Sequence, residues 1–206
     1  MAPPLADAAV RLAGGADRAR IAALLASAFA DDPAMGFIFP DPADRGKRLP
    51  RLFALMIDNG ASAGMRLVTA GGEATTLWRA PGHARTTRLA MLRSLVPMLH
   101  ALGPALGRAM RVSEAIDAHL PAGDFWYLHI AGCDPAHQGR GFGAAAVRAG
   151  LRRAAGRLPA HLETPTERNL GFYGGLGFRV TSEWTVPGGG PRFWSMRREP
   201  GPLAGA

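Results

Sequence analysis

Hydrophobic residues in the N-terminal part of the chain recur with the spacings of a short strand and an amphipathic helix. The run 8–12 predicts a first strand, and Asp17 stands where a helix N-cap is expected. The helix that follows has apolar residues every three or four positions, which is the helical period. These apolar residues are Ile21, Leu24, Leu25 and Phe29.

The next segment predicts a loop and a second helix. Asp31-Asp32-Pro33 is expected to end the first helix, and the aromatic run 35–40 to form a loop. Residues 42–59 have helical periodicity, although Pro50 falls inside the run and is expected to break or restart the helix.

Two β-rich runs then surround a glycine pair, which is typical of a hairpin. The runs are 65–70 and 73–79, and Gly71-Gly72 separates them. From 85 to 119 the pattern is helical again. It is interrupted at Pro97 and at Gly103-Pro104, so two or three helical pieces are expected.

The C-terminal part opens with the most apolar strand of the chain, 125–133. Asp134-Pro135 ends this strand, and a glycine-rich loop at 138–143 leads into an alanine-rich helix predicted over 141–158. The face of this helix toward the sheet is expected to carry four apolar side chains. They are Val147, Leu151, Ala154 and Leu158.

Three further strands and one helix complete the prediction. A short strand is expected at 160–163, and Thr164-Pro165-Thr166-Glu167 has the pattern of a capping box that starts a helix ending at Gly174-Gly175. Two final strands are predicted at 178–186 and 192–198.

Length and composition indicate one domain. The chain has 206 residues, 48% of them hydrophobic, which is enough to bury a full core. It has no apolar run of membrane-spanning length and no signal sequence, so a cytoplasmic protein is expected. The only cysteine, Cys133, excludes an internal disulfide and fits a reducing compartment.

The net charge of +8 raises the question of nucleic-acid binding. The basic residues are almost all arginines, Lys47 being the only lysine, and they are spread from Arg11 to Arg198 without a basic run. Because nucleic acids favour clustered basic residues, no nucleic-acid partner is expected. A positive field still favours a polyanionic cofactor.

The glycine-rich loop has the chemistry of an anion site. Backbone N–H groups at the start of a helix point into one concavity, and glycines let a phosphate approach. One interpretation is the dinucleotide fingerprint Gly139-x-Gly141-x-x-Ala144 of a Rossmann fold, with Glu163 taking a ribose hydroxyl. Too few strand–helix units follow the loop for that fold, so this alternative is weaker.

The second interpretation is Gln138-x-x-Gly141-x-Gly143, which resembles the pyrophosphate loop of the Gcn5-related N-acetyltransferases (GNAT family). Other segments occur in the order and spacing of that family, and they most resemble the puromycin N-acetyltransferase-like branch. The strong resemblance covers about 123–198. These segments are Leu162-Glu163-Thr164, Arg168-Asn169, Phe172-Tyr173, Gly177-Phe178 and Trp194-Ser-Met-Arg197.

The resemblance implies an α/β fold: a mixed, mostly antiparallel sheet of about seven strands, flanked by helices and splayed between its fourth and fifth strands. It implies a single domain in which 8–122 shape the acceptor site and 123–198 bind acetyl-CoA, with frayed tails. The residues expected at the cofactor are Ile130, Ala131, Cys133, Gln138, Gly139, Arg140, Gly141, Phe142, Gly143, Ala144, Asn169 and Tyr173.

Acetyl transfer to an amine needs a base for the amine and an acid for the leaving thiolate. The resemblance places Tyr173 beside the cofactor sulfur, as the acid; a packed core tyrosine is the alternative. His129, expected on the same strand face as Tyr127 and Ala131, is the first candidate base, and Glu163 is the second. A buried structural histidine is an equal alternative to a catalytic His129, and water alone is a further alternative as the base. No metal site is expected.

Cys133 is expected to be a small apolar residue rather than an acyl carrier, so direct transfer in a ternary complex is expected. The acceptor is expected to be a small-molecule primary amine. The chain is expected to be a monomer or a homodimer, and a non-catalytic acyl-CoA-binding module stays an alternative. The acceptor pocket is expected among Asp31, Asp32, Phe37, Phe39, Trp78 and the helices of 85–119.

Overall fold

A seven-stranded mixed sheet with the order β1-β2-β3-β4-β5-β7-β6 forms the centre of the molecule in the computed structural model. The structure describes residues 9–60, 64–85, 94–154 and 158–201. Within these residues, six strand pairs join the sheet, and only β4 and β5 run parallel. The strands are β1 (Val10–Leu12), β2 (Gly64–Thr69), β3 (Ala74–Arg79), β4 (Trp126–Cys133), β5 (Ala160–Thr164), β6 (Arg179–Thr185) and β7 (Arg192–Arg198).

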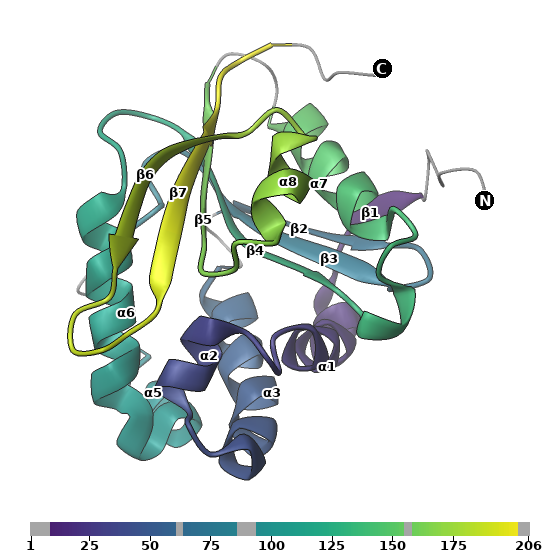
Figure 1. The fold of residues 1–206 in the computed structure, drawn as a ribbon. Helices are drawn as coiled ribbons and strands as arrows, with labels where there is room; N and C mark the ends of the chain where they lie inside the picture. The colour runs from purple at the N-terminus through teal and green to yellow at the C-terminus, as the bar shows by residue number, and fades with distance from the viewer. Residues whose placement is uncertain (1–8, 61–63, 86–93, 155–157, 202–206) are drawn as a thin grey trace.

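Helices cover both faces of the sheet. In Figure 1, α7 lies above strands β1 to β3, while α1 and α3 lie below them. Three short 3₁₀ turns, η1 (Gly15–Asp17), η2 (Gly103–Ala105) and η3 (Pro135–His137), connect the elements. The helices are α1 (Arg18–Ala28), α2 (Pro33–Ile38), α3 (Pro42–Asn59), α5 (Leu95–Leu102), α6 (Leu106–His119), α7 (Phe142–Arg153) and α8 (Asn169–Gly174).

The sheet divides into two arms because β4 and β5 pair at only two positions. Trp126 pairs with Ala160 and Tyr127 with His161. Beyond these residues, β4 and β5 no longer pair with each other. Figure 1 shows them diverging toward α8 and α1. We call this V-shaped opening the fork. The splay expected between the fourth and fifth strands is confirmed.

A β-bulge in β4 accompanies the fork. Leu77 pairs with Ile130 and Trp78 with Leu128, so His129 is an extra residue on β4. The bulge reverses the alternation of side chains, and Ala131 packs with Leu128 on the α7 side of the sheet. The expectation that Tyr127, His129 and Ala131 share one face is therefore wrong.

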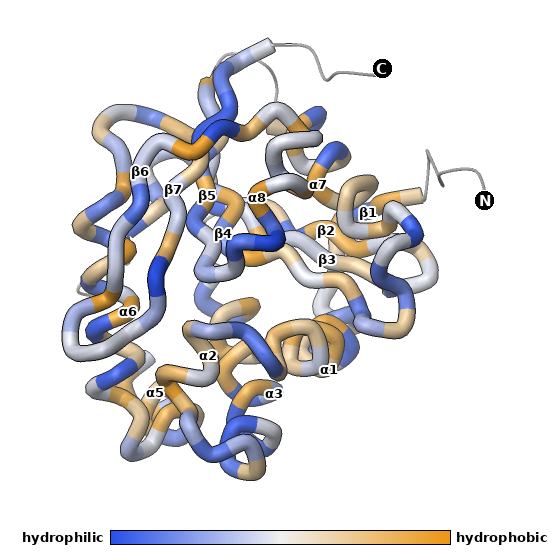
Figure 2. The backbone as a smooth tube through the Cα atoms, viewed as in Figure 1, coloured by the Kyte–Doolittle hydropathy of each residue, from blue (hydrophilic) through white to orange (hydrophobic). Residues whose placement is uncertain are grey.

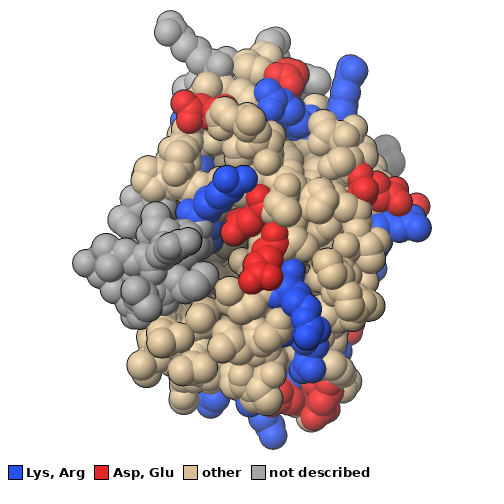
Figure 3. All heavy atoms as spheres, turned by 90° about the vertical axis from the view of Figure 1, so that its left-hand side faces the viewer, with Lys and Arg blue, Asp and Glu red and all other residues tan. Residues whose placement is uncertain are grey.

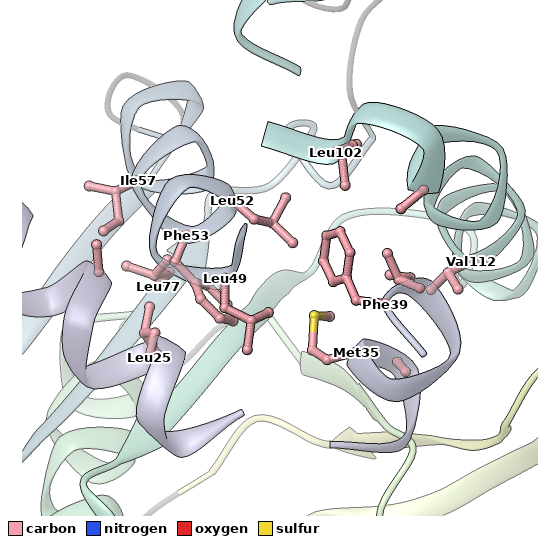
Figure 4. Close-up of a cluster of buried hydrophobic side chains, with 14 of the residues drawn as sticks. Leu25, Met35, Phe39, Leu49, Leu52, Phe53, Ile57, Leu77, Leu102 and Val112 are labelled. Atoms are coloured by element: carbon pink, nitrogen blue, oxygen red, sulfur yellow. The ribbon is translucent and has the colours of Figure 1, made fainter. Parts of the chain in front are cut away.

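The larger hydrophobic core lies on the face opposite α7, where α1, α2, α3, α5 and α6 meet the sheet. Figure 2 shows hydrophobic stretches where these helices face one another. Phe39 points into the space bounded by Met35, Leu52 and Leu102 (Figure 4). Phe39 and Trp78 are buried and Phe37 is half-buried. None of them, and no described residue of 85–119, lines the cavity described below, so this part of the expected acceptor pocket is wrong.

Four local predictions need correction. The segment expected to be a loop at 35–40 belongs mostly to α2, because Asp32 caps it: its Oδ1 accepts hydrogen bonds from the N–H groups of Ala34 (2.9 Å) and Met35 (3.1 Å). Pro50 does not break α3, since buried side chains on both sides of it, Leu49 and Leu52, anchor the helix in the core.

The other two corrections concern the ends of α7 and α8. Helix α7 ends at Arg153, and Leu158 is exposed rather than packed on the sheet. Helix α8 begins at Asn169 rather than with a capping box at Thr164, because two turns at 166–170 precede it. The Thr164 hydroxyl instead accepts from the N–H of Thr166 at 3.3 Å.

The remaining elements match their predictions within a few residues. The helical pieces expected between 85 and 119 are α5 and α6, apart from 86–93, which lie outside the described residues. Residue 8 of the first strand, 155–157 of the long helix and most of both expected frayed tails also lie outside them.

We expect Gly150→Ala to destabilise the protein. Gly150 in α7 faces the buried indole of Trp78, and a Cβ there would approach the ring to within van der Waals overlap. Overpacking of this kind costs about 1–3 kcal/mol, which lowers the melting temperature by several degrees. Gly107→Ala in α6, where a Cβ meets nothing within 4 Å, is the matched control and should leave the melting temperature equal or higher. Equal melting temperatures for both variants would contradict this packing.

Candidate active site

A cavity of about 660 Å³ opens at the fork between the two arms of the sheet. Its wall combines the end of β4, the loop 138–143, the first turn of α7, the end of α1 with the residues up to 32, and α8. Of the residues expected at the cofactor, all line this cavity except Ile130 and Arg140. The structure thus brings together most of the residues that the sequence predicts at the cofactor. Their contacts with the cofactor stay a prediction.

The loop before α7 presents the start of a helix to this cavity. The first backbone hydrogen bond of α7 runs from the N–H of Ala145 to the carbonyl of Gly141 at 2.9 Å, so the N–H groups of 142–144 precede the helical ladder. Gly139 (φ +75°) and Gly141 (φ +87°) adopt the left-handed conformation that shapes the concavity. This arrangement fits a diphosphate.

Two side chains support the loop. Gln138 Nε2 donates to the carbonyl of Cys133 at 3.4 Å, as a bracing role requires. Arg140 is exposed, and its guanidinium lies 5.3 Å from the ring centre of Phe142. Both contacts hold the loop in its conformation, and neither indicates a catalytic role for Gln138 or Arg140.

The edge of β4 that faces the fork is open beyond Tyr127. Residues 130–133 pair with β3 on their other edge only, so their backbone groups toward β5 are free of strand partners within the described strands. An extended ligand arm fits such an edge by strand-like pairing.

Tyr173 on α8 lines the cavity and is 8% exposed. Burial, and then the negative charge of Asp32, raises the pKa of its hydroxyl, which is therefore protonated at neutral pH. The ring is held by edge contacts with Phe172 and Phe178, at centroid distances of 5.0 and 5.9 Å. The position and protonation state both suit a general acid.

Asp32 is an acidic residue in the wall of the same cavity. Burial raises its pKa to about 6, although hydrogen bonds from the N–H groups of Met35 and Ala34 and the charge of Arg168 act in the other direction. Asp31 lines the cavity beside it. The sequence singled out both residues only as acceptor-pocket candidates; the coupling of Asp32 to Tyr173 depends on the tertiary structure.

His129 and Glu163, the expected bases, do not line the cavity. His129 lies at the bulge with its ring 5.4 Å from that of Tyr127, and burial, reinforced by Arg79, lowers its pKa well below the ordinary value. The imidazole is therefore neutral. Glu163 lies deeper in the fork and bonds to His161. Their catalytic roles stay predictions.

Asn169 and Cys133 also face the cavity. Asn169 Nδ2 donates to Thr164 Oγ1 at 3.4 Å, which ties the start of α8 to the end of β5. Cys133 is half-buried, and burial raises the pKa of its thiol. A thiol with a raised pKa is a poor nucleophile at neutral pH.

Charge on the surface is mixed. On the face of the molecule that carries α6, acidic side chains lie next to basic ones (Figure 3). The described part of the chain holds no group of three or more acidic, histidine or cysteine side chains that could bind a metal. None of its described helices is long and apolar enough to cross a membrane.

No known family model matches the sequence, but solved structures resemble the fold over nearly its whole length. The protein described as histone acetyltransferase HPA2 and related acetyltransferase, from Corynebacterium glutamicum, has a TM-score of 0.72 and 26% identity, over 95% of this chain and 97% of its own. Arylalkylamine N-acetyltransferase 2 from Aedes aegypti has a TM-score of 0.60 and 10% identity, over 93% of this chain and 98% of its own.

Polyamine N-acetyltransferase from Drosophila melanogaster is a third similar structure, with a TM-score of 0.58 and 13% identity over 93% of this chain and 99% of its own. The fold is that of the GNAT acetyltransferases, and the Rossmann alternative is wrong because only one of the strand pairs in the described residues is parallel. The structures that resemble this fold are named as acetyltransferases, which supports an acetyl-CoA-dependent N-acetyltransferase.

Proposed function

We propose that this chain moves the acetyl group of acetyl-CoA to a primary amine of a small molecule by direct transfer in a ternary complex. The observation that carries the proposal is the cavity at the fork, which combines the helix-start loop 138–143, Tyr173 and Asp32. The structural relatives include enzymes named for arylalkylamine and polyamine acceptors, which supports an amine acceptor.

Acetyl-CoA supplies an activated acetyl thioester. The N–H groups of 142–144 would hold its diphosphate, and the open edge of β4 would pair with its pantetheine arm. Tyr173 gives its proton to the leaving sulfur. Asp32 attracts the ammonium group of the acceptor and, by its charge, keeps Tyr173 protonated. With its raised thiol pKa, Cys133 takes no acyl group, which supports direct transfer.

The sequence resemblance to the puromycin N-acetyltransferase-like branch favours an antibiotic or nucleoside-type amine as the acceptor. A thiol-release screen of amine classes tests this, with aminoglycosides, aminonucleosides, polyamines and arylalkylamines as acceptors. Release of CoA with at least one class supports the function. Tight acetyl-CoA binding without release by any class would favour the non-catalytic acyl-CoA-binding alternative.

We expect Asp32→Asn to retain the stability of the protein while lowering its activity. The folded-state pKa of about 6 exceeds the ordinary 3.8, so the stability that the protonated carboxyl supplies is lost as pH rises from about 4 to 6. Asparagine also caps helices, and it carries no charge. Thermal melts should show that this variant is at least as stable as the wild type at pH 8 and lacks that pH dependence.

The same variant should bind the acceptor less well. We expect kcat/KM for the amine to fall about tenfold at pH 8, and the extra loss of wild-type activity below about pH 6 to disappear. The measurement is kcat/KM against pH at saturating acetyl-CoA. An unchanged profile would show that Asp32 has no part in the reaction.

A further inference from the structure

The segment that follows α8 lines a second cavity. Its volume is about 680 Å³, close to that of the cavity at the fork, and the two cavities share no lining residue. Its wall combines Arg148 of α7, the segment 175–177 after α8, the start of β6, and the end of β7 with the residues up to 201. Figure 1 shows the end of β7 beside the segment that joins α8 to β6.

The charged side chains of this second cavity are almost all positive. Four arginines and one glutamate line it: Arg148, Arg179, Arg197, Arg198 and Glu199. Because guanidinium groups stay charged in proteins, the wall has an excess of three positive charges. We call this site the arginine cavity. Such an excess of charge favours an anionic ligand.

Strand pairing places two of these arginines directly opposite each other. Arg179 is the first residue of β6 and pairs with Arg197 near the end of β7. Like charges at opposite positions of neighbouring strands are destabilising. Glu199 Oε1 lies 2.6 Å from Arg197 Nε and is thus paired with only one of the two arginines. An anion bound in the arginine cavity would reduce the remaining repulsion.

Two of the arginines have donors available to a ligand. Arg148 and Arg179 form no hydrogen bond or ion pair with any described residue. Arg198, in contrast, is half-buried, and its two Nη atoms donate to the carbonyls of Glu199 (3.3 Å) and Gly201 (3.0 Å). The arginine cavity therefore has fixed positive charge at the end of β7 and unpaired guanidinium groups on α7 and β6.

The rest of the wall suits a small organic molecule. Val180 is 47% exposed and lines the cavity together with the buried Leu176, so apolar side chains lie among the charges. Binding sites for small molecules have volumes of about 300–1,000 Å³ and combine apolar walls with a few polar groups. The arginine cavity has both properties.

We propose that the arginine cavity binds a small organic molecule that carries two or more phosphate groups. Phosphate groups place several negative charges in a small volume, as the excess of three positive charges requires. Their oxygens also accept paired hydrogen bonds from guanidinium groups. The site is distinct from the loop 138–143, which lines the cavity at the fork, and it does not depend on acetyl transfer.

Calorimetry with inorganic pyrophosphate tests the proposal. The protein is first saturated with CoA, so that the probe does not compete for the loop 138–143. We expect one pyrophosphate to bind per chain, with a dissociation constant at least tenfold higher in Arg148→Gln and in Arg179→Gln. Arg152→Gln is the matched control and should bind as the wild type does, because Arg152 is also on α7 but does not line the arginine cavity.

Thermal melts provide a second measurement. Without pyrophosphate, Arg179→Gln should melt at the same temperature as the wild type or higher, because one of two opposed charges is removed. Pyrophosphate should raise the melting temperature of the wild type more than that of this variant.

The inference would be overturned by wild-type affinity in both Arg148→Gln and Arg179→Gln, or by the absence of saturable binding to the CoA-loaded wild type. Binding that occurs only without CoA would also overturn it, because the pyrophosphate would then occupy the cofactor site.

Discussion

Replacing Tyr173 with phenylalanine is expected to lower turnover by about 10²–10⁴-fold, the range that general acids supply. The hydroxyl stays protonated well above neutral pH, because burial and then the charge of Asp32 raise its pKa. Phenylalanine keeps the ring between Phe172 and Phe178, so packing is retained. The affinity for acetyl-CoA and the melting temperature should change little. The measurement is kcat from thiol release at saturating amine and acetyl-CoA.

The pH dependence of wild-type turnover provides a second test of Tyr173. Since the pKa of Tyr173 is raised far above neutrality, the wild type should show no loss of activity between pH 7 and 9 that is due to this hydroxyl. Turnover of Tyr173→Phe within about threefold of wild type, less than 1 kcal/mol of transition-state stabilisation, would remove Tyr173 from the mechanism.

The second large effect is expected in the loop before α7. Gly141 lines the cavity, and Gly141→Ala adds a Cβ to a backbone conformation (φ +87°) that side chains rarely adopt. We expect acetyl-CoA affinity to fall 10- to 100-fold, about 1.4–2.7 kcal/mol, in calorimetry. Gly82→Ala is the matched control, because Gly82 has φ +78°, equally open surroundings and a place in a remote turn.

A variant at a second glycine distinguishes the effect of backbone strain from that of contact with the ligand. Gly143 has an ordinary φ, and a Cβ there would make only van der Waals contacts with Phe172 and Cys133. Gly143→Ala should therefore fold normally and still bind acetyl-CoA more weakly. Wild-type affinity in both loop variants would show that the loop does not hold the cofactor.

Much of the fold was predictable because its signals are local. The glycine pair between two β-rich runs correctly predicts the hairpin of β2 and β3, and the apolar periodicity of 42–59 correctly predicts α3. Helix α2 was not predicted, since its start depends on the Asp32 side chain accepting two backbone N–H groups. The capping-box pattern at 164–167 was misleading, because the chain turns twice before α8 begins.

The candidate site also has residues that the sequence predicts and residues whose role depends on the tertiary structure. The glycine loop and Tyr173 were identified by sequence order, because their motifs are contiguous. The bulge at His129 is a property of the pairing with β3, so the strand pattern alone placed Ala131 on the wrong face. The bond between His161 and Glu163, and the raised pKa of Asp32, depend on burial by segments distant in sequence.

The most direct test of the account follows a labelled acetyl group from acetyl-CoA to the amine by mass spectrometry, with wild type and Tyr173→Phe side by side. The account predicts an N-acetylated amine and an equal amount of free CoA with the wild type, and at least a hundredfold less of both with the variant. Absence of labelled amide with every amine class, from a folded protein that binds acetyl-CoA, would contradict it.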